Sequence, residues 1–308
     1  MTKITLENQF AHTIRSTYKK AGEDWLVRLP ALIKQCAQQW HLADLQPLKN
    51  LTYNYVLVGK QHDADIVLKL RCDPTEMRRE AYALMAFQNC GGVRLLDHDE
   101  KGGALLLLRV QPGNTLMGNF PHNDAESTRI AAKLLSRLHG ASIELNHQFP
   151  SLRTVLPDLS KDFPELSPFM PVARALKNQL LAKEHSPVLL HGDFHEGNIL
   201  YAGRDDWVAI DPAGIIGDPL YDAAVYMRNP LKILMEQADA ALIVERRIRE
   251  FSKFLNCSPQ RLFDWTYLQT LCSAYWSLED GLNAHLHCSF LHMLKHINGF
   301  SGLHQSSH

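Results

Sequence analysis

The spacing of apolar residues in the first part of the chain predicts a helix followed by a β-hairpin. Between residues 24 and 41 apolar side chains recur at helical spacing on one face, which is typical of an amphipathic helix. Two apolar-rich runs follow at 53–58 and 66–70, and the polar segment 59–65 between them indicates a hairpin with a loose loop. The apolar positions of the helix are Trp25, Leu29, Leu32, Cys36 and Trp40.

A second helix and two further strands are expected to complete a first lobe. Asp73-Pro74-Thr75 is typical of a helix start, and the helix is expected to run to about Gln88. Residues 93–96 and 104–108 are strand candidates separated by a charged turn that contains two glycines. The segment 111–113, Gln-Pro-Gly, breaks the pattern, so we place a lobe boundary there and expect domains at 1–110 and 111–308.

Past this boundary the pattern is mainly helical, with two short apolar runs in the middle. The helical spacing of leucine and isoleucine predicts long helices, and a proline-rich stretch indicates an irregular connection. The expected segments are a helix at 125–139, an irregular connection at 149–171, short apolar runs at 188–190 and 208–210, and helices from 231 to 297 that are interrupted near Ser258-Pro259.

Composition and charge exclude several classes of protein. The 308 residues are 45% hydrophobic and 21% charged, which is ordinary for a globular protein. With 32 basic and 33 acidic residues, the chain has no basic footprint for nucleic acid or for an anionic membrane. No signal peptide or membrane-spanning run is expected. Six scattered cysteines without a Cys-x-x-Cys pair indicate reduced thiols in a cytoplasmic protein.

The most informative segment reads His-Gly-Asp-Phe-His-Glu-Gly-Asn from His191 to Asn198, and Ile-Asp-Pro follows at 210–212. Phosphoryl transfer requires an oriented acceptor hydroxyl, metal ions held on the phosphates and neutralised charge. Asp193 is the candidate base, and Asn198 and Asp211 are candidate ligands of Mg²⁺. Asp211 follows a strand-like run, so a hairpin would return it to the loop that carries the other two.

This spacing resembles the catalytic loop and the metal-binding aspartate of protein kinases. The His-Gly-Asp form, and an acid-Pro sequence in place of Asp-Phe-Gly, resemble the aminoglycoside phosphotransferases. The alternative is an ordinary pair of Asp- and Asn-rich turns. Three residues of metal-binding type at fixed spacing between two apolar runs favour the kinase-like interpretation.

Lys69, at the end of the apolar run Ile66-Val67-Leu68, resembles the phosphate-binding lysine of kinases. Glu80 on the next predicted helix would then pair with this lysine, and Glu76, one turn earlier, is the competitor. The apolar residues that follow Glu80 favour its side of the helix as the inward one. Alternatively, Lys69 is an edge residue whose stem lies on apolar surface and whose ammonium reaches solvent.

The remaining nucleotide contacts are assigned by the same resemblance. No glycine-rich loop precedes the strand, and no Walker-type phosphate loop occurs anywhere in the chain. Thr52 and the backbone near it occupy the place of the phosphate-covering loop. Leu107-Leu108-Arg109-Val110 is the expected connector between lobes, where the backbone at Leu108 and Val110 would meet the adenine edge. The missing glycines favour the aminoglycoside kinases over the protein kinases.

Flanking motifs narrow the resemblance to the streptomycin/hydroxyurea phosphotransferase family. Leu108 departs from that pattern, because an acid is expected there, but backbone hydrogen bonds to adenine do not depend on the side chain. The resemblance covers nearly the whole chain. Its motifs are Trp25-Leu26-x-x-Leu29-Pro30, Gly91 to Leu96, Leu105 to Leu108 with Pro112-Gly113, and Ser273 to Gly281.

The resemblance implies an α+β, two-lobed, protein-kinase-like fold. Residues 1–110 would be a nucleotide-binding N-lobe with an antiparallel sheet and a helical extension, and 111–308 a mostly helical C-lobe for catalysis and the acceptor. The nucleotide would lie in the cleft between the lobes. The implied ligands are ATP or GTP, Mg²⁺ and a small-molecule acceptor of the streptomycin type, or hydroxyurea. These motifs do not specify the oligomeric state.

Two groups of residues are assigned supporting and acceptor-binding roles. His191 and Asp222 are expected to support the catalytic loop, with Asp222 accepting backbone N–H groups; alternatively Asp222 only complements the positive end of a helix. Trp276, Glu279 and Asp280 would share a helix face and offer a polycation a flat apolar surface and carboxylates. The alternative for these three is a core tryptophan with two solvated acids.

Two rival functions remain at this stage. One is a kinase for an endogenous hydroxylated metabolite, which would use the same catalytic loop and a different acceptor pocket. The other is a catalytically silent ligand-binding relative, against which the complete set of Lys69, Asp193, Asn198 and Asp211 argues. A protein kinase is disfavoured because no Ala-Pro-Glu pattern follows Asp211.

Overall fold

The computed structural model describes residues 6–142, 148–182 and 186–297. Contacts within the chain divide it into two compact units. Unit 1 comprises residues 1–88 and 92–113, and unit 2 comprises 89–91 and 114–308. None of the described helices has both the length and the apolar character needed to cross a membrane.

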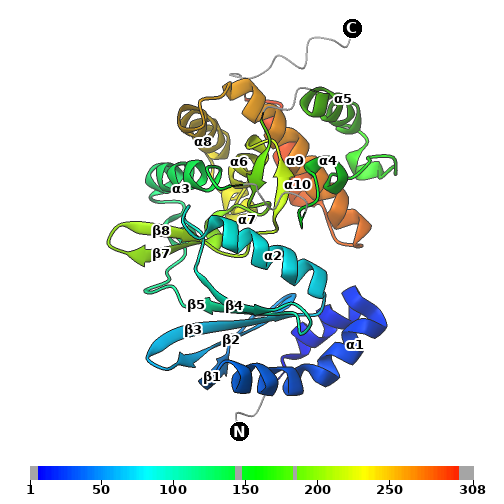
Figure 1. Ribbon diagram of the computed structural model, residues 1–308. Helices are drawn as coiled ribbons and strands as arrows, with labels where there is room; N and C mark the ends of the chain where they lie inside the picture. Colours follow the sequence, from blue (N-terminus) through cyan, green and yellow to red (C-terminus); the bar gives the residue numbers. More distant parts are fainter. Residues whose placement is uncertain (1–5, 143–147, 183–185, 298–308) are drawn as a thin grey trace. The chain divides into compact units, whose positions relative to one another are not determined.

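Unit 1 is built on a five-stranded antiparallel sheet with the strand order β1-β2-β3-β5-β4 (Figure 1). β3 is the central strand, so its backbone groups are paired on both sides. The elements of unit 1 in chain order are α1 (Asn8–Gln39), β1 (Leu42–Pro47), β2 (Asn54–Gln61), β3 (Ala64–Arg71), α2 (Pro74–Phe87), β4 (Leu95–Asp99) and β5 (Ala104–Leu108).

The β2–β3 hairpin is confirmed, but its turn is tighter than the sequence predicted. Pairing continues to Gln61 and Ala64, so only His62 and Asp63 lie between the strands. His62 has φ 53°, the left-handed conformation that two-residue hairpin turns favour. The polar residues 59–65 thus belong mostly to strands, because one face of this hairpin end is exposed to solvent. The prediction of a loose loop was wrong.

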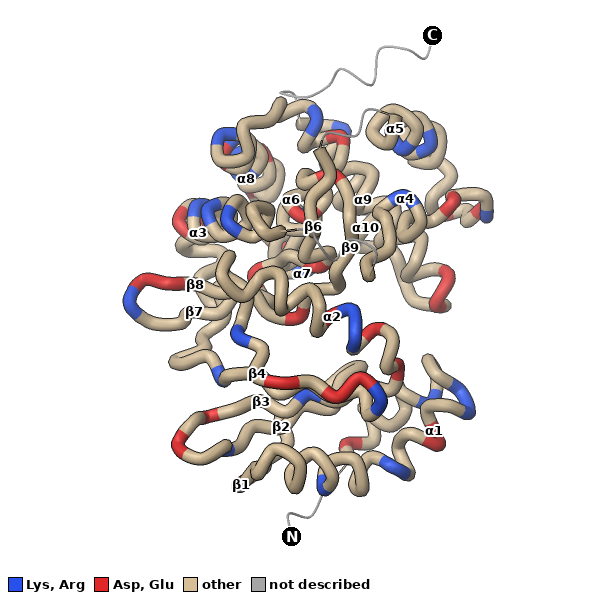
Figure 2. Tube along the Cα trace, viewed as in Figure 1, with Lys and Arg blue, Asp and Glu red and all other residues tan. Residues whose placement is uncertain are grey.

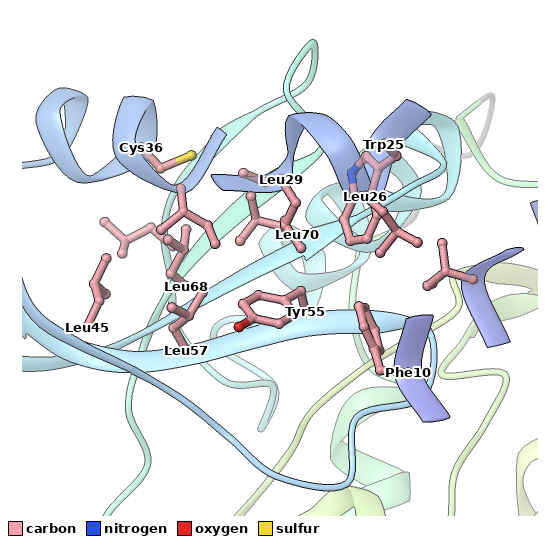
Figure 3. Packing of buried hydrophobic residues seen from close by; sticks show 14 of the residues in the cluster. Phe10, Trp25, Leu26, Leu29, Cys36, Leu45, Tyr55, Leu57, Leu68 and Leu70 are labelled. Carbon is pink, nitrogen blue, oxygen red and sulfur yellow. The ribbon is translucent and has the colours of Figure 1, made fainter. Parts of the chain in front are cut away.

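The core of unit 1 lies between α1 and one face of the sheet. Figure 3 shows Trp25, Leu29 and Cys36 of the helix above Leu68 and Leu70 of the central strand. Burying each large apolar side chain contributes about 1.5–3 kcal/mol. This burial explains why the helical pattern was readable in the sequence.

Three boundaries in unit 1 differ from the prediction. α1 begins at Asn8 rather than near 24, with a non-helical residue at Lys19 (φ 51°, ψ −126°) where two helical segments meet. β1 was not predicted, since only Leu45 of this edge strand is buried. β4 starts at Leu95, two residues later than expected. Edge strands carry a weak apolar pattern because only part of their surface contacts the core.

α2 begins and ends close to its predicted bounds. The side chain of Asp73 accepts a hydrogen bond from the Thr75 N–H (2.8 Å), and Pro74 occupies the first helical position. The helix buries Ala81 and Leu84 together with Glu80. A carboxylate on the buried face of a helix requires a partner.

Unit 2 is mostly helical and carries two small two-stranded sheets, β6 with β9 and β7 with β8 (Figure 1). Its elements in chain order are α3 (Asp124–Leu138), α4 (Leu152–Val155), α5 (Met170–Ala182), β6 (Val188–Leu190), β7 (Ile199–Gly203), β8 (Asp206–Ala209), β9 (Ile215–Gly217), α6 (Leu220–Met227), α7 (Leu231–Met235), α8 (Ala240–Phe254), α9 (Pro259–Glu279) and α10 (His285–Leu294).

α9 is the central helix of unit 2. Residues 262–272 are all buried, including Trp265, because α6, α5, α8 and α10 surround the helix. A helix that is buried on all sides occupies a core position. The predicted interruption near Ser258-Pro259 is confirmed by the start of α9, and a further break at 280–284 separates α9 from α10.

Candidate active site

The loop between β6 and β7 carries the His-Gly-Asp motif and has a conformation that requires glycine. Gly192 has φ +84°, and a Cβ atom built on it would lie 2.9 Å from the Cβ of Ala213. Past Asp193, the Nδ1 atom of His195 accepts the Gly197 N–H (3.0 Å) and caps a 3-10 turn that ends at Asn198. Local sequence therefore determines the path of this loop.

The β7–β8 hairpin returns Asp211 to the same loop, as the spacing predicted. The Ile210 N–H donates to the carbonyl oxygen of Asn198 (2.9 Å), so the two candidate metal ligands are held by adjacent backbone. Asp211 has φ 61°, a left-handed conformation that is uncommon outside glycine. The hairpin tip, Arg204 to Asp206, is charged and exposed (Figure 2).

His191 ties the loop to the segment that bears Asp211. Its Nε2 atom lies 2.8 Å from the carbonyl oxygen of Ile210, and its own carbonyl accepts the Ala213 N–H (2.7 Å). Its Nδ1 atom accepts the Asp193 N–H (3.3 Å), so Nε2 carries the proton that is donated to Ile210. Burial lowers the pKa of His191 despite nearby carboxylates, which keeps the ring neutral.

Asp222 makes the contacts expected of a support for the loop. Its carboxylate is fully buried and accepts the N–H groups of His191 (2.8 Å) and Gly192 (2.7 Å). His139 Nε2 lies 3.1 Å from the same carboxylate. Asp222 sits within the first turn of α6, but helix-end complementation alone would not require two backbone donors from another segment. Asp218 precedes the helix, where it accepts the Leu220 N–H (3.0 Å).

Asp193 is ionised and reachable from solvent. Burial of its carboxyl acts to raise the pKa, but the hydrogen bond and charge of His195 outweigh this effect and the pKa falls to about 2. His191 and Arg228 add smaller effects in the same direction. Because 58% of the side chain is exposed, the burial effect is only partial. With this low pKa the Asp193 carboxylate is a weak base, but it remains ionised and can accept hydrogen bonds.

Asn198 and Asp211 fit a divalent cation that is also bound by phosphate. The Asn198 amide nitrogen donates to the carbonyl oxygen of Asp193 (2.9 Å), which leaves the amide oxygen as the atom for a cation. Amide and carboxylate oxygens are ligands that Mg²⁺ accepts. Among the residues that the structure describes, no group of three or more acidic, histidine or cysteine side chains could hold a metal. A site with two protein ligands would be completed by phosphate oxygens.

In unit 1 the structure selects Glu80 over Glu76 as the partner of Lys69. The Lys69 ammonium lies 2.7 Å from the Glu80 carboxylate, and both side chains are at most 5% exposed. Glu76 pairs instead with Arg71. Lys69 lies on the central strand, so the alternative of an edge lysine that reaches solvent was wrong.

The other predicted nucleotide contacts lie in two loops of unit 1. Thr52 is exposed in the loop between β1 and β2, and Val110 follows β5. The Leu108 N–H donates to the Arg94 carbonyl (2.9 Å), and the Arg109 N–H donates to the Asp65 carbonyl (3.0 Å). These two N–H groups are used within unit 1, so an N–H donor for an adenine edge would come from Val110 rather than from Leu108.

The three predicted acceptor residues lie at the C-terminal end of α9. Trp276 is partly buried, so it is not a fully enclosed core tryptophan, and Glu279 and Asp280 are exposed. α9 ends at Glu279, and Asp280 is the residue that caps it. The Asp280 N–H still donates to the Trp276 carbonyl oxygen (3.0 Å), so the three residues keep helical spacing at this end.

A buried ion network contacts the loop, and no pattern in the sequence indicated it. Glu196, inside the motif, is 1% exposed and pairs with Arg247 (3.2 Å). Arg247 also binds Asp124 (2.6 Å) and donates to the backbone carbonyl oxygen of Met227 (3.2 Å). Burial raises the pKa of Glu196 to about 7, and the Arg247 charge opposes that rise. Arg247 stands in a run of charged residues on α8, so its burial was not readable from the pattern.

Comparison with known proteins identifies the family. A family model described as aminoglycoside/hydroxyurea antibiotic resistance kinase matches residues 39–281, which is most of the chain. The chain belongs to this kinase family. The kinase is 30% identical to streptomycin 6-kinase of Streptomyces griseus over 85% of this chain and 87% of that protein. It is 28% identical to hydroxyurea phosphotransferase of Kitasatospora aureofaciens, over 85% of this chain and 76% of that protein.

A solved structure supports the fold class. The kinase resembles a thermostable mutant of aminoglycoside phosphotransferase APH(4)-Ia, in a ternary complex with ADP and hygromycin B, with a TM-score of 0.63 and 16% identity. The likeness covers 89% of this chain and 99% of that one. The two-lobed, kinase-like α+β fold predicted from the motifs is thus confirmed. The protein is a small-molecule kinase, a phosphotransferase with an alcohol group as acceptor.

Proposed function

We propose that this kinase transfers the γ-phosphoryl group of a nucleoside triphosphate to a hydroxyl group of an aminoglycoside such as streptomycin, or to hydroxyurea. The observation that carries the proposal is a pair of hydrogen bonds: the Asn198 side chain donates to Asp193, and Ile210, which precedes Asp211, donates to the carbonyl oxygen of Asn198. Relatives named streptomycin 6-kinase and hydroxyurea phosphotransferase support the choice of acceptors.

Asp193 orients the acceptor hydroxyl and takes its proton. The acceptor oxygen forms a bond to the γ-phosphorus, the bond from that phosphorus to the β–γ bridging oxygen breaks, and the nucleoside diphosphate leaves. A carboxylate whose pKa is about 2 is a poor base for a resting hydroxyl. Proton transfer therefore follows bond formation to phosphorus, when the hydroxyl becomes acidic, and the earlier role of Asp193 is orientation.

Asn198 and Asp211 hold Mg²⁺, and Lys69 binds the phosphates while Glu80 keeps its ammonium in place. Bound Mg²⁺ would neutralise charge on the transferred phosphoryl group. The buried 2.7 Å pair supports the role of Lys69, since a lysine on a central strand is otherwise costly to bury. His191 and Asp222 keep the loop rigid, and a rigid loop holds Asp193 in the geometry that in-line attack needs.

The remaining contacts are assigned to the loops and to α9. Thr52 would contact phosphate, and the backbone at Val110 the adenine edge, with ATP or GTP as the donor. Trp276 offers the acceptor an apolar face, and Glu279 and Asp280 attract a cationic one. Six free thiols accord with a reducing compartment, and we propose the cytoplasm, where nucleoside triphosphates are available.

A phosphate-transfer screen tests this function. Purified full-length protein would be incubated with Mg²⁺ and ATP or GTP, and with streptomycin, hydroxyurea and a set of neutral hydroxylated metabolites in turn. Phosphorylated streptomycin or hydroxyurea in the wild type, with turnover reduced roughly 10²–10⁴-fold in Asp193→Ala, is the expected result. Phosphorylation of a neutral metabolite alone would show that the protein is a metabolite kinase.

A further inference from the structure

Arg228, the residue that ends α6, is held in place by neutral side chains. Its Nε atom donates to Gln269 Oε1 (2.9 Å) and its Nη2 atom to Ser273 Oγ (2.9 Å), both on α9. Gln269 also donates to Ser273 Oγ (3.3 Å). The planar guanidinium is therefore fixed in one orientation by two residues one helical turn apart.

Arg228 differs from Arg247, the buried arginine of α8, because it makes no ion pair with a carboxylate that the structure describes. Arg247 is paired with Asp124 and Glu196. Among the described residues Arg228 makes no ion pair with a carboxylate, and burial lowers its pKa although the charge of Asp193 acts in the opposite direction. A largely buried charge that no carboxylate contacts directly is unfavourable, and such charges are characteristic of functional sites.

The position of Arg228 links α9 to the catalytic loop. Asp222, six residues earlier on α6, binds the N–H of Gly192, and Tyr226 packs on Phe194 with ring centroids 6.3 Å apart. Asp193 lies between these two contact points. Arg228 follows Tyr226 by two residues, so α6 connects it to the loop that carries Asp193.

The described part of α10 carries a buried polar atom that lacks a hydrogen-bond partner. His287 Nδ1 on α10 is buried and has no hydrogen-bond partner among the residues that the structure describes. Burial lowers the pKa of His287 to about 4, with the Arg228 charge contributing, so the ring is neutral near pH 7. A neutral imidazole and a guanidinium whose charge acts on it favour an oxygen atom over an ammonium group.

We propose that Arg228, with His287, forms a subsite that binds an oxygen of the acceptor next to the hydroxyl that is phosphorylated. This inference rests on the proposed function. Arg228 is then a specificity-determining residue: it selects acceptors whose reacting end carries a carbonyl, a hydroxyl or an anionic oxygen, and it disfavours an ammonium group there. Hydroxyurea has a carbonyl beside its hydroxyl, and a sugar or cyclitol has vicinal hydroxyls.

The subsite also determines the direction in which an acceptor would lie along α9. From Ser273 to Asp280 is seven residues, or about 10 Å at 1.5 Å per residue. Trp276 lies between them at helical spacing. A cationic acceptor would therefore place its oxygen-rich reacting end at Arg228, its ring on Trp276 and its ammonium or guanidinium groups toward Glu279 and Asp280. A small neutral acceptor would use only the Arg228 end.

The test uses two variants of Arg228. Arg228→Met removes the charge, and Arg228→Lys keeps the charge but loses the planar guanidinium with its several N–H donors. The control is Arg129→Met, which removes an exposed arginine elsewhere in the unit. Arg228→Met is expected to raise the KM of the phosphorylated acceptor by about 10- to 100-fold, as loss of a charged hydrogen bond implies. Arg228→Lys should raise it less. The nucleotide KM should change by less than about two-fold, because only acceptor binding is lost.

The same variants also show which results would overturn the inference. An unchanged acceptor KM in Arg228→Met, or a nucleotide KM raised as much as the acceptor KM, overturns the inference. If the wild type phosphorylates neither streptomycin nor hydroxyurea, the proposed function fails, and acetate then probes the subsite alone. Saturation transfer to acetate by NMR that is seen in wild type and Arg129→Met but lost in Arg228→Met supports the subsite, and equal transfer in all three refutes it.

Discussion

Replacing Asp222 with asparagine tests how the catalytic loop is held. The carboxylate accepts two backbone N–H groups at 2.8 and 2.7 Å and has no exposed surface. An asparagine keeps one acceptor oxygen, but its NH₂ group then faces the second N–H. One hydrogen bond to a charged acceptor is lost, at about 1.5–3 kcal/mol, and a buried donor left unsatisfied costs about 1–3 kcal/mol more.

The expected decrease in the free energy of unfolding is therefore about 3–5 kcal/mol. If Asp222 only complemented the positive end of α6, the decrease would be about 0.3–1 kcal/mol. Asp239→Asn is the matched control, because this exposed acid stands at the start of α8 and caps it with no side-chain hydrogen bond. Urea unfolding of the wild type and both variants measures the difference.

Hydrogen exchange then locates the effect. The His191 and Gly192 amides should lose protection in Asp222→Asn, and turnover should fall because Asp193 follows them directly. Protection elsewhere in unit 2 should change less. A loss of stability near that of Asp239→Asn, with unchanged exchange at 191 and 192, would refute the role of Asp222 as a support for the loop.

Three further predictions concern the metal, the phosphates and the acceptor. Asp211→Asn should raise the Mg²⁺ concentration needed for half-maximal activity, and an identical Mg²⁺ titration would rule out direct ligation. Glu80→Gln should raise the nucleotide KM in steady-state assays and lower the free energy of unfolding by about 3 kcal/mol, whereas Glu76→Gln should lower it by about 0–1 kcal/mol. Equal effects of the two substitutions would contradict the assignment of Glu80 as the partner of Lys69. The double variant Glu279→Gln and Asp280→Asn, or high salt, should raise the KM for streptomycin and leave that for hydroxyurea unchanged; a salt-independent streptomycin KM would argue against an ionic acceptor site.

The catalytic loop was predictable because its chemistry depends on residue type and spacing over a short stretch. Asp193 and Asn198 share one loop, and the apolar run before Asp211 is long enough only for a hairpin return. The Lys69 partner was harder, because Glu76 and Glu80 lie on one helix and only their orientation toward β3 distinguishes them. The structure shows Glu80 at 2.7 Å and Glu76 with Arg71.

The sequence alone determined the class of chemistry, the order of the main elements and the motif residues, since local spacing and apolar periodicity are properties of the chain itself. The tertiary structure decided which charges are buried together. Arg228 and Arg247 carry the same charged group, yet carboxylates contact Arg247 and neutral side chains contact Arg228. Burial and pairing depend on segments far apart in sequence that packing alone brings together, and the free energy of a charge depends on those neighbours.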